Sequence, residues 1–219
     1  MRYDLVLNPS SGTDMLSLSW RDQFYIGLLL SLVMVVTRSH HFIDTMHVPD
    51  ASNAIFFLVG FYLRVHFAWV IYCALAVIVD CIAINWIGIS SFCITPAYIA
   101  LLPAYLVLWL AGRWCADGCI KVNGQNSFLA LIHIFLVASA AALTAELITS
   151  GSFYFFGGRF ATPTLAGFML RLLVYFPRTW IAMMLYISIT TLIHGSVYFA
   201  WLWRRGSGYR FKEIIKPLC

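Results

Sequence analysis

The chain has 219 residues, of which 62% are hydrophobic and only 11% are charged. Soluble domains carry roughly a quarter charged residues, so this composition excludes a soluble globular domain and a disordered chain, and it argues against a nucleic-acid binder. The net charge of +5 is then interpreted by position, because basic residues in a membrane protein mostly report its orientation.

Six apolar stretches are candidates to cross a bilayer as helices, which takes roughly 20 residues each. In chain order they cover residues 23–37, 51–63, 67–89, 97–112, 128–149 and 180–203. A semi-apolar stretch, residues 165–175, contains Arg171 and is followed by Pro177, so we interpret it as an external, partly buried or interfacial segment. The sequence therefore predicts one all-α membrane domain over residues 1–219, a bundle of six transmembrane helices.

The positions of the basic residues favour an orientation with the N and C termini in the cytoplasm. Six spans with this topology place ten of the 14 Lys and Arg residues on the inner side, where such residues are normally enriched. The other four are external: Arg38, Arg159, Arg171 and Arg178. A topology with seven spans would instead put the basic C-terminal tail outside.

The third span, residues 67–89, has the most unusual polar pattern. Asp80 in this span and Glu146 in the fifth are the two acids placed clearly inside spans, and such groups are functional hypotheses by default. Cys81 and Asn85 are four residues apart and share a helix face, which predicts a site with one thiol and one amide facing the bundle interior. The alternative is that Cys81 packs as a small hydrophobe.

Two histidines lie within predicted spans, His133 in the fifth and His194 in the sixth. The topology places both near the inner face, whereas Asp80 and Cys81 lie in the outer half. An intramembrane enzyme built on these groups would need them at one depth, so a hydrogen-bonded structural role is the simpler interpretation of each histidine.

Two external segments carry unusual residues. Residues 38–50 are polar and could bind a metal or a polar ligand, although a solvated loop is the simpler explanation. This loop contains His40, His41 and His47. Residues 150–163 are aromatic where a loop should be polar, and they include Tyr154 and Phe155. Such side chains suit a lid over a large apolar ligand, and anchoring at the membrane interface explains them as well.

The span pattern, a pair of small residues on the first span and the polar outer half resemble the substrate-binding S-components of energy-coupling-factor (ECF) vitamin transporters. Within that group, residues 79–86 (VDCIAINW) and 92–98 (FCITPAY) resemble the BtuM-type cobalamin transporters of Gram-negative bacteria. The resemblance implies binding and uptake of cobalamin (vitamin B12) across the bacterial inner membrane. It also implies that Cys81 ligates the cobalt from the periplasmic side, and that the outer loops cover the ligand.

The resemblance further implies that Cys81 has a catalytic role in removing the upper cyanide of cyanocobalamin. A thiolate is a soft, strongly donating metal ligand, and its donation onto cobalt would weaken the bond to a cyanide on the opposite face. From their positions alone, we expect five aromatic and two polar residues to contact the corrin. They are Trp86, Phe92, Tyr98, Tyr154, Phe155, Asp80 and Asn85.

The chain departs from the S-component pattern on its first span. S-components that dock on the shared ATP-driven module usually have Ala-x-x-x-Ala there, whereas this chain has Gly27 and Ser31. The sequence therefore leaves two hypotheses. The chain docks on an ECF module through these two residues, or it takes up its substrate without a module. The chain has no P-loop, so we expect it to bind no ATP itself. The alternative functions are an S-component for another vitamin, an intramembrane enzyme, and a membrane sensor or scaffold.

Overall fold

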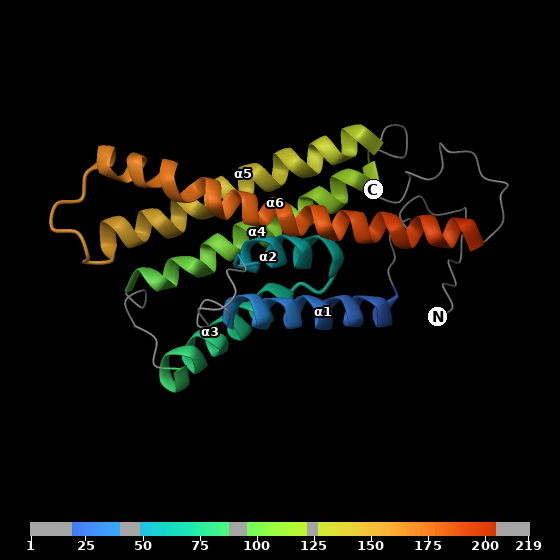
Figure 1. Ribbon diagram of the computed structural model, residues 1–219, viewed down its shortest axis with the longest axis horizontal. Coiled ribbons are helices and arrows are strands. Elements are labelled where there is room, and N and C mark those ends of the chain that lie inside the picture. The colour runs from blue at the N-terminus through green and yellow to red at the C-terminus, as the bar shows by residue number, and fades with distance from the viewer. Residues whose placement is uncertain (1–18, 40–48, 88–95, 122–126, 205–219) are drawn as a thin grey trace.

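The computed structural model describes residues 19–39, 49–87, 96–121 and 127–204. Within these ranges the regular elements are all helices, which pack along the long axis of the molecule (Figure 1). They are α1 (Trp20–Ser39), α2 (Ser52–Tyr62), α3 (Ala68–Ile87), the 3-10 helix η3 (Pro96–Ala100), α4 (Leu101–Lys121), α5 (Ser127–Phe156) and α6 (Leu165–Arg204). For the described residues the prediction of an all-α fold is confirmed, and each predicted span overlaps one of their six α-helices.

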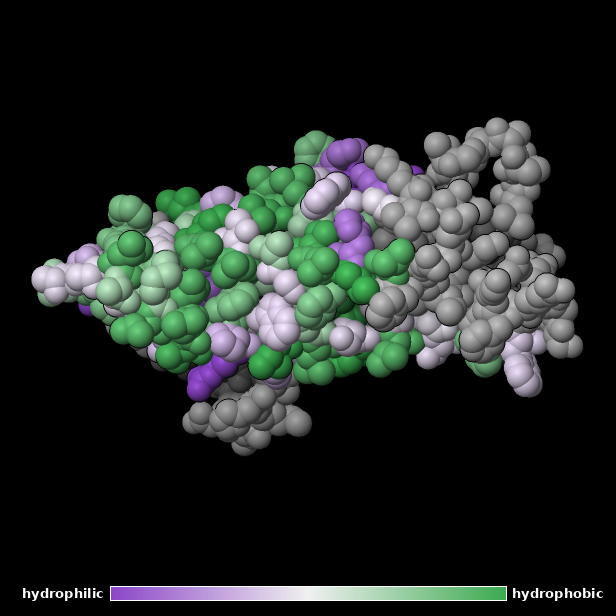
Figure 2. All heavy atoms as spheres, turned by 90° about the horizontal axis from the view of Figure 1, so that it is seen from above, coloured by the Kyte–Doolittle hydropathy of each residue, from purple (hydrophilic) through white to green (hydrophobic). Residues whose placement is uncertain are grey.

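In the part of the chain that the structure describes, four helical stretches are long and apolar enough to cross a membrane: Ala68–Asn85, Ala97–Gly118, Leu129–Phe156 and Leu165–Val197. The outer surface of the bundle is also apolar, because large side chains such as Leu170, Leu173 and Leu192 are exposed. Figure 2 shows hydrophobic residues over most of the described part of one face, with hydrophilic residues in isolated spots. An apolar exterior of this extent is unfavourable in water. Together these features indicate a multi-pass membrane protein.

The predicted separation of residues 165–175 from the sixth span is wrong. Both belong to α6, one continuous helix of 40 residues that includes Pro177. The fifth helix is also longer than predicted, since it continues to Phe156. Arg171 does not interrupt α6, because its guanidinium lies over the ring of Phe160, 4.6 Å from the centroid.

α2 lies among the longer helices, and Ile55 to Gly60 are buried. Its closest neighbour is α4. A Cβ atom on Gly60 would lie 2.0 Å from the main-chain oxygen of Trp109, and one on Gly112 would lie 2.0 Å from that of Phe57. No side chain fits in either space. The two glycines therefore let the backbones of α2 and α4 touch, as small residues do where membrane helices pack closely.

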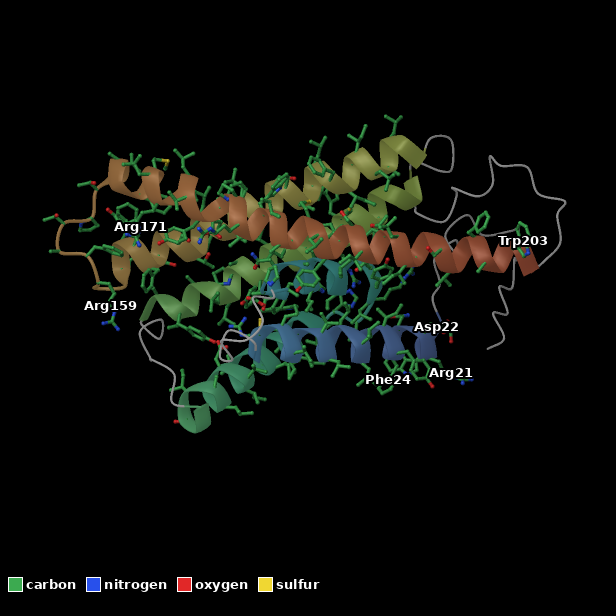
Figure 3. The ribbon with its side chains drawn as sticks, viewed as in Figure 1. Arg21, Asp22, Phe24, Arg159, Arg171 and Trp203 are labelled. Carbon is green, nitrogen blue, oxygen red and sulfur yellow. The ribbon has the colours of Figure 1, made fainter. Side chains whose placement is uncertain are left out.

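The bundle has two ends that Figure 3 identifies by labelled residues. Arg21 and Trp203 lie at the end where α1 begins and α6 finishes, called here the Trp203 end. Arg159 and Arg171 lie at the opposite end, the Arg171 end. Because α1 and α5 run from the Trp203 end towards the Arg171 end (Figure 1), the last turn of α1 and the second half of α5 are displaced towards the Arg171 end.

Candidate functional site

An ion pair joins the last turn of α1 to α3. Arg38 donates two hydrogen bonds to Asp80, one from Nε to Oδ1 and one from Nη2 to Oδ2, both 2.6 Å long. The two side chains are only 11% and 16% exposed. A planar guanidinium matches a carboxylate through two parallel bonds, which is the strongest form of this interaction. Each charge thus offsets the desolvation cost of the other.

Three further side chains complete the bonding of this pair. Arg38 Nη1 donates to the hydroxyl oxygens of Ser52, at 2.9 Å, and Tyr105, at 3.0 Å. The Tyr98 hydroxyl donates to Asp80 Oδ2 at 2.6 Å. We call these five residues the Arg38–Asp80 cluster. Its members come from α1, α2, α3, η3 and α4, so one polar cluster connects five elements of the bundle.

Two members of the cluster, Ser52 and Tyr105, are held in place by a second carboxylate and by an aromatic stack. Asp50 Oδ1 accepts hydrogen bonds from the main-chain N–H of Ser52, at 3.0 Å, and from its hydroxyl, at 2.7 Å. The Ser52 oxygen is therefore left to accept from Arg38. The ring of Tyr105 stacks on that of Phe56, with centroids 3.9 Å apart and planes 9° from parallel. These contacts fix the two hydroxyl groups that receive the guanidinium.

Cys81 and Asn85 lie on a different side of α3 from Asp80. They share a face as predicted, and the Asn85 amide donates to the main-chain oxygen of Cys81 at 2.9 Å. In the part of the chain that the structure describes, however, this face is exposed. The predicted interior location is thus corrected, because neighbouring residues on a helix project about 100° apart and Asp80 takes the interior side. By contrast, Cys73 on the same helix is buried.

The structure places the other predicted site residues in separate groups. Tyr98 belongs to the Arg38–Asp80 cluster. Tyr154 and Phe155 lie near the end of α5, with ring centroids 5.9 Å and 5.5 Å from that of Phe168 on α6. The backbone of Trp86 belongs to α3, but its side chain is outside the described part. Also outside the described residues are Phe92, His40, His41 and His47.

The small residues on α1 take part in an internal helix contact. The Tyr72 hydroxyl on α3 donates to the main-chain oxygen of Gly27 at 2.7 Å, and both Gly27 and Ser31 are half-buried. The exposed side of α1 carries larger apolar residues, among them Leu28 and Leu32. The pair predicted for module docking therefore faces α3 in this structure.

The two histidines lie closer to the Trp203 end. His133 is in the first two turns of α5, with its ring 6.0 Å from that of Trp114. His194 is in the last third of α6, where its Nδ1 lies 3.3 Å from the Tyr62 hydroxyl. Neither forms a hydrogen bond with the Arg38–Asp80 cluster among the described residues. Both contacts are structural ones between neighbouring helices.

A second buried acid lies on α5. Glu146 is 6% exposed, and both of its oxygens accept hydrogen bonds from hydroxyl groups, Oε1 from Ser150 and Oε2 from Thr179 of α6 at 3.1 Å. The next residue on α6, Trp180, donates its Nε1–H to Ser139 at 3.0 Å. Hydrogen bonds between polar side chains therefore connect α5 to α6 around Glu146 and Ser139.

Sequence reasoning missed three members of the Arg38–Asp80 cluster. It assigned Arg38 only to the external basic residues, and it considered neither Ser52 nor Tyr105. The sequence did contain a clue to the pairing of Arg38 with Asp80. An aspartate inside an apolar span requires a cation or several donors, and Arg38 directly follows another span. The pairing itself joins residues 42 positions apart, which no local pattern specifies.

No family model matches the chain, and neither does any curated protein.

Proposed function

We propose that the chain is an inner-membrane protein that binds cobalamin through Cys81 and carries it across the bacterial membrane. The observation that supports this most directly is the exposed Cys81 thiol, which a ligand can reach. A corrin ring already supplies the equatorial nitrogen ligands of its cobalt. One protein thiolate therefore completes an axial position, and a soft, strongly donating ligand suits that metal.

The proposed topology has six spans and both termini in the cytoplasm, so α1 and α2 join the four long apolar helices. The Arg171 end is then periplasmic, and Cys81 lies in the outer half of α3. The residue before it, Asp80, is held by Arg38 and Tyr98 through three hydrogen bonds of 2.6 Å. A ligand that is supported by fixed neighbours keeps its geometry, because those neighbours restrict the motion of the backbone beside it.

The geometry changes the roles expected of the polar residues. Both oxygens of Asp80 accept bonds from Arg38, and one also accepts from Tyr98, so we assign Asp80 to holding α3 and not to receiving a corrin amide. Asn85 is exposed on the same face as Cys81. Its amide oxygen is an acceptor suited to the amide N–H groups around the corrin. Asn85 is therefore the polar contact that this proposal retains beside the thiolate.

The same ligation supports decyanation as a ligand exchange at cobalt. The Cys81 thiolate donates an electron pair to the metal and weakens its bond to the axial cyanide on the opposite face. The ligand that the thiolate replaces leaves with its own electron pair. Cyanide leaves with the electron pair of its broken bond and takes up the proton that the Cys81 thiol lost, so the cobalt is neither oxidised nor reduced. Cys81 is both metal ligand and catalytic residue in this proposal.

Cys81→Ser is expected to abolish the change that the protein causes in the absorption spectrum of cyanocobalamin. A serine hydroxyl at this position is a hard donor that does not ionise near neutral pH, so cobalt loses its thiolate ligand. The measurement is a titration of purified full-length protein with cyanocobalamin. Cys73→Ser is the matched control, since it removes a buried thiol from the same helix and should leave the spectral change intact. A parental spectral change in C81S would show that Cys81 does not bind cobalt.

Two measurements separate this function from its alternatives. Mass spectrometry of small molecules that copurify with the protein distinguishes cobalamin from another vitamin. Copurification of an ATPase module tests coupling to an ECF transporter through α1, and its absence together with normal uptake supports solitary action. An intramembrane enzyme built on Cys81 and a histidine is not favoured, because His133 and His194 are displaced towards the Trp203 end.

A further inference from the structure

Glu146 is a buried acid that the proposed cobalamin chemistry does not use. It lies well inside the apolar stretch Leu129–Phe156, and its side-chain hydrogen-bond partners are hydroxyl groups of Ser150 and Thr179. Within the described ranges, no Lys, Arg or His forms an ion pair with it. A buried carboxylate without a cation carries a desolvation cost that protonation removes.

The hydroxyl group of Thr179 can serve both protonation states of Glu146. It has one hydrogen and two acceptors within reach, Glu146 Oε2 at 3.1 Å and the main-chain oxygen of Phe176 at 3.0 Å. If Glu146 is ionised, the hydroxyl donates to the carboxylate. If Glu146 is protonated, the carboxyl group donates to the Thr179 oxygen, and the hydroxyl donates to Phe176. The proton is accommodated by reversing the bonds, without moving the three residues apart.

The turn of α6 that faces Glu146 is also the one with a proline. Pro177 lies between Phe176 and Thr179, and it has no N–H to donate within the helix. The bond that Pro177 cannot make is the one to the main-chain oxygen of Leu173, and the side-chain bond from Thr179 to Phe176 lies directly after this gap. Whether that bond forms depends on the protonation state of Glu146. Glu146 and the turn of α6 that follows Pro177 are therefore connected through one hydroxyl group, that of Thr179.

Other ionisable groups on the elements packed against α5 are engaged elsewhere or exposed. On α6, Arg171 lies over aromatic rings, Arg178 is exposed, and the Tyr186 hydroxyl donates to the oxygen of Pro49. Tyr98 on η3 and Tyr105 on α4 belong to the Arg38–Asp80 cluster, Arg113 on α4 donates to main-chain oxygens, and Asp117 is exposed. The remaining such groups with described side chains on α4, α5 and α6 are Cys115, His133, Tyr154, Tyr175 and His194. Among the described residues, none of the groups named in this paragraph forms a hydrogen bond or ion pair with Glu146.

We propose that Glu146 is a reversible proton-binding site inside the membrane domain, with Thr179 as its hydrogen-bond partner in both states. The ligand is a proton, and the occupancy of the site sets the side-chain bonding of the Pro177 turn. This inference goes beyond cobalamin binding and does not depend on it.

Infrared difference spectroscopy during a pH titration tests the site in full-length protein embedded in lipid nanodiscs. Acidification should produce the C=O stretching band of a protonated carboxyl group, and return to the starting pH should remove it. Glu146→Gln should lose the component of this band that comes from the buried carboxyl group, whereas Asp117→Asn, which neutralises an exposed acid on α4, should retain that component. Thr179→Val should shift the frequency of the band, because the carboxyl group loses one hydrogen-bond partner.

Two outcomes would overturn the proposal. One is an E146Q spectrum that matches the parent throughout the pH range in which the protein stays folded. The other is a T179V band with the parental frequency and midpoint. Because valine is close to threonine in shape, T179V decides the question even if E146Q does not fold.

Discussion

Asp80→Ala is expected to lower the free energy of unfolding by about 3 kcal/mol, the lower end of the range for removing one partner of a buried ion pair. The substitution leaves Arg38 charged, with Ser52 and Tyr105 as partners but no carboxylate to balance the charge. We choose the lower end because water reaches part of the pair, whose side chains are 11% and 16% exposed. Denaturant or thermal unfolding in detergent micelles measures the loss.

A double substitution separates the cost of the unpaired charge from the value of the pair. Arg38→Met combined with Asp80→Leu removes both charges, and such replacements are often neutral or stabilising. The double variant should therefore be more stable than Asp80→Ala alone. Asp117→Ala, on the exposed side of α4, should change stability by less than about 0.5 kcal/mol. If Asp80→Ala unfolds like the parent, the ion pair does not hold the helices together.

Gly112→Ala is expected to destabilise the fold by about 3 kcal/mol, the upper end of the usual range for overpacking. Its new Cβ would lie 2.0 Å from the main-chain oxygen of Phe57, and a backbone atom cannot turn aside as a side chain can. α2 and α4 must therefore separate. The loss should appear as a lower midpoint of thermal unfolding and, because α2 carries Ser52, as weaker bonding of Arg38.

Gly195→Ala is the control for this prediction. Gly195 is also a helical glycine, but a Cβ atom there meets nothing within 4 Å. The change should raise stability by up to about 1 kcal/mol, because alanine is the better helix former. If Gly112→Ala behaves like Gly195→Ala, the close contact between α2 and α4 is not required for stability.

Local patterns predicted the helices because a continuous apolar run determines a membrane helix without reference to the rest of the chain. The prediction failed where the outcome depended on distant residues. Arg171 and Pro177 indicated an interruption, yet the helix continues because aromatic residues of another segment cover the guanidinium and one proline does not remove the other bonds of a 40-residue helix.

The candidate site was predictable to a similar extent. The common face of Cys81 and Asn85 followed from helical spacing, and the importance of Asp80 followed from its charge. The partner of Asp80 did not, because Arg38 lies 42 residues earlier and meets it only in the folded bundle. The exposure of Cys81 also depended on which side of α3 the ion pair occupies. Sequence thus identified the chemical groups but not their orientation.

The length of α6 bears on the sidedness of the protein. Forty residues of helix extend about 60 Å, roughly twice the thickness of the hydrocarbon layer, and tilting within the usual range of about 0–40° does not remove that excess. Part of α6 must therefore project from the bilayer. At its start, the turn from α5 through Gly158, which has a φ of 67°, presents the exposed Arg159. Trypsin added to sealed vesicles would reach this arginine from one side only, and the resulting fragments would show which face of the membrane holds the Arg171 end.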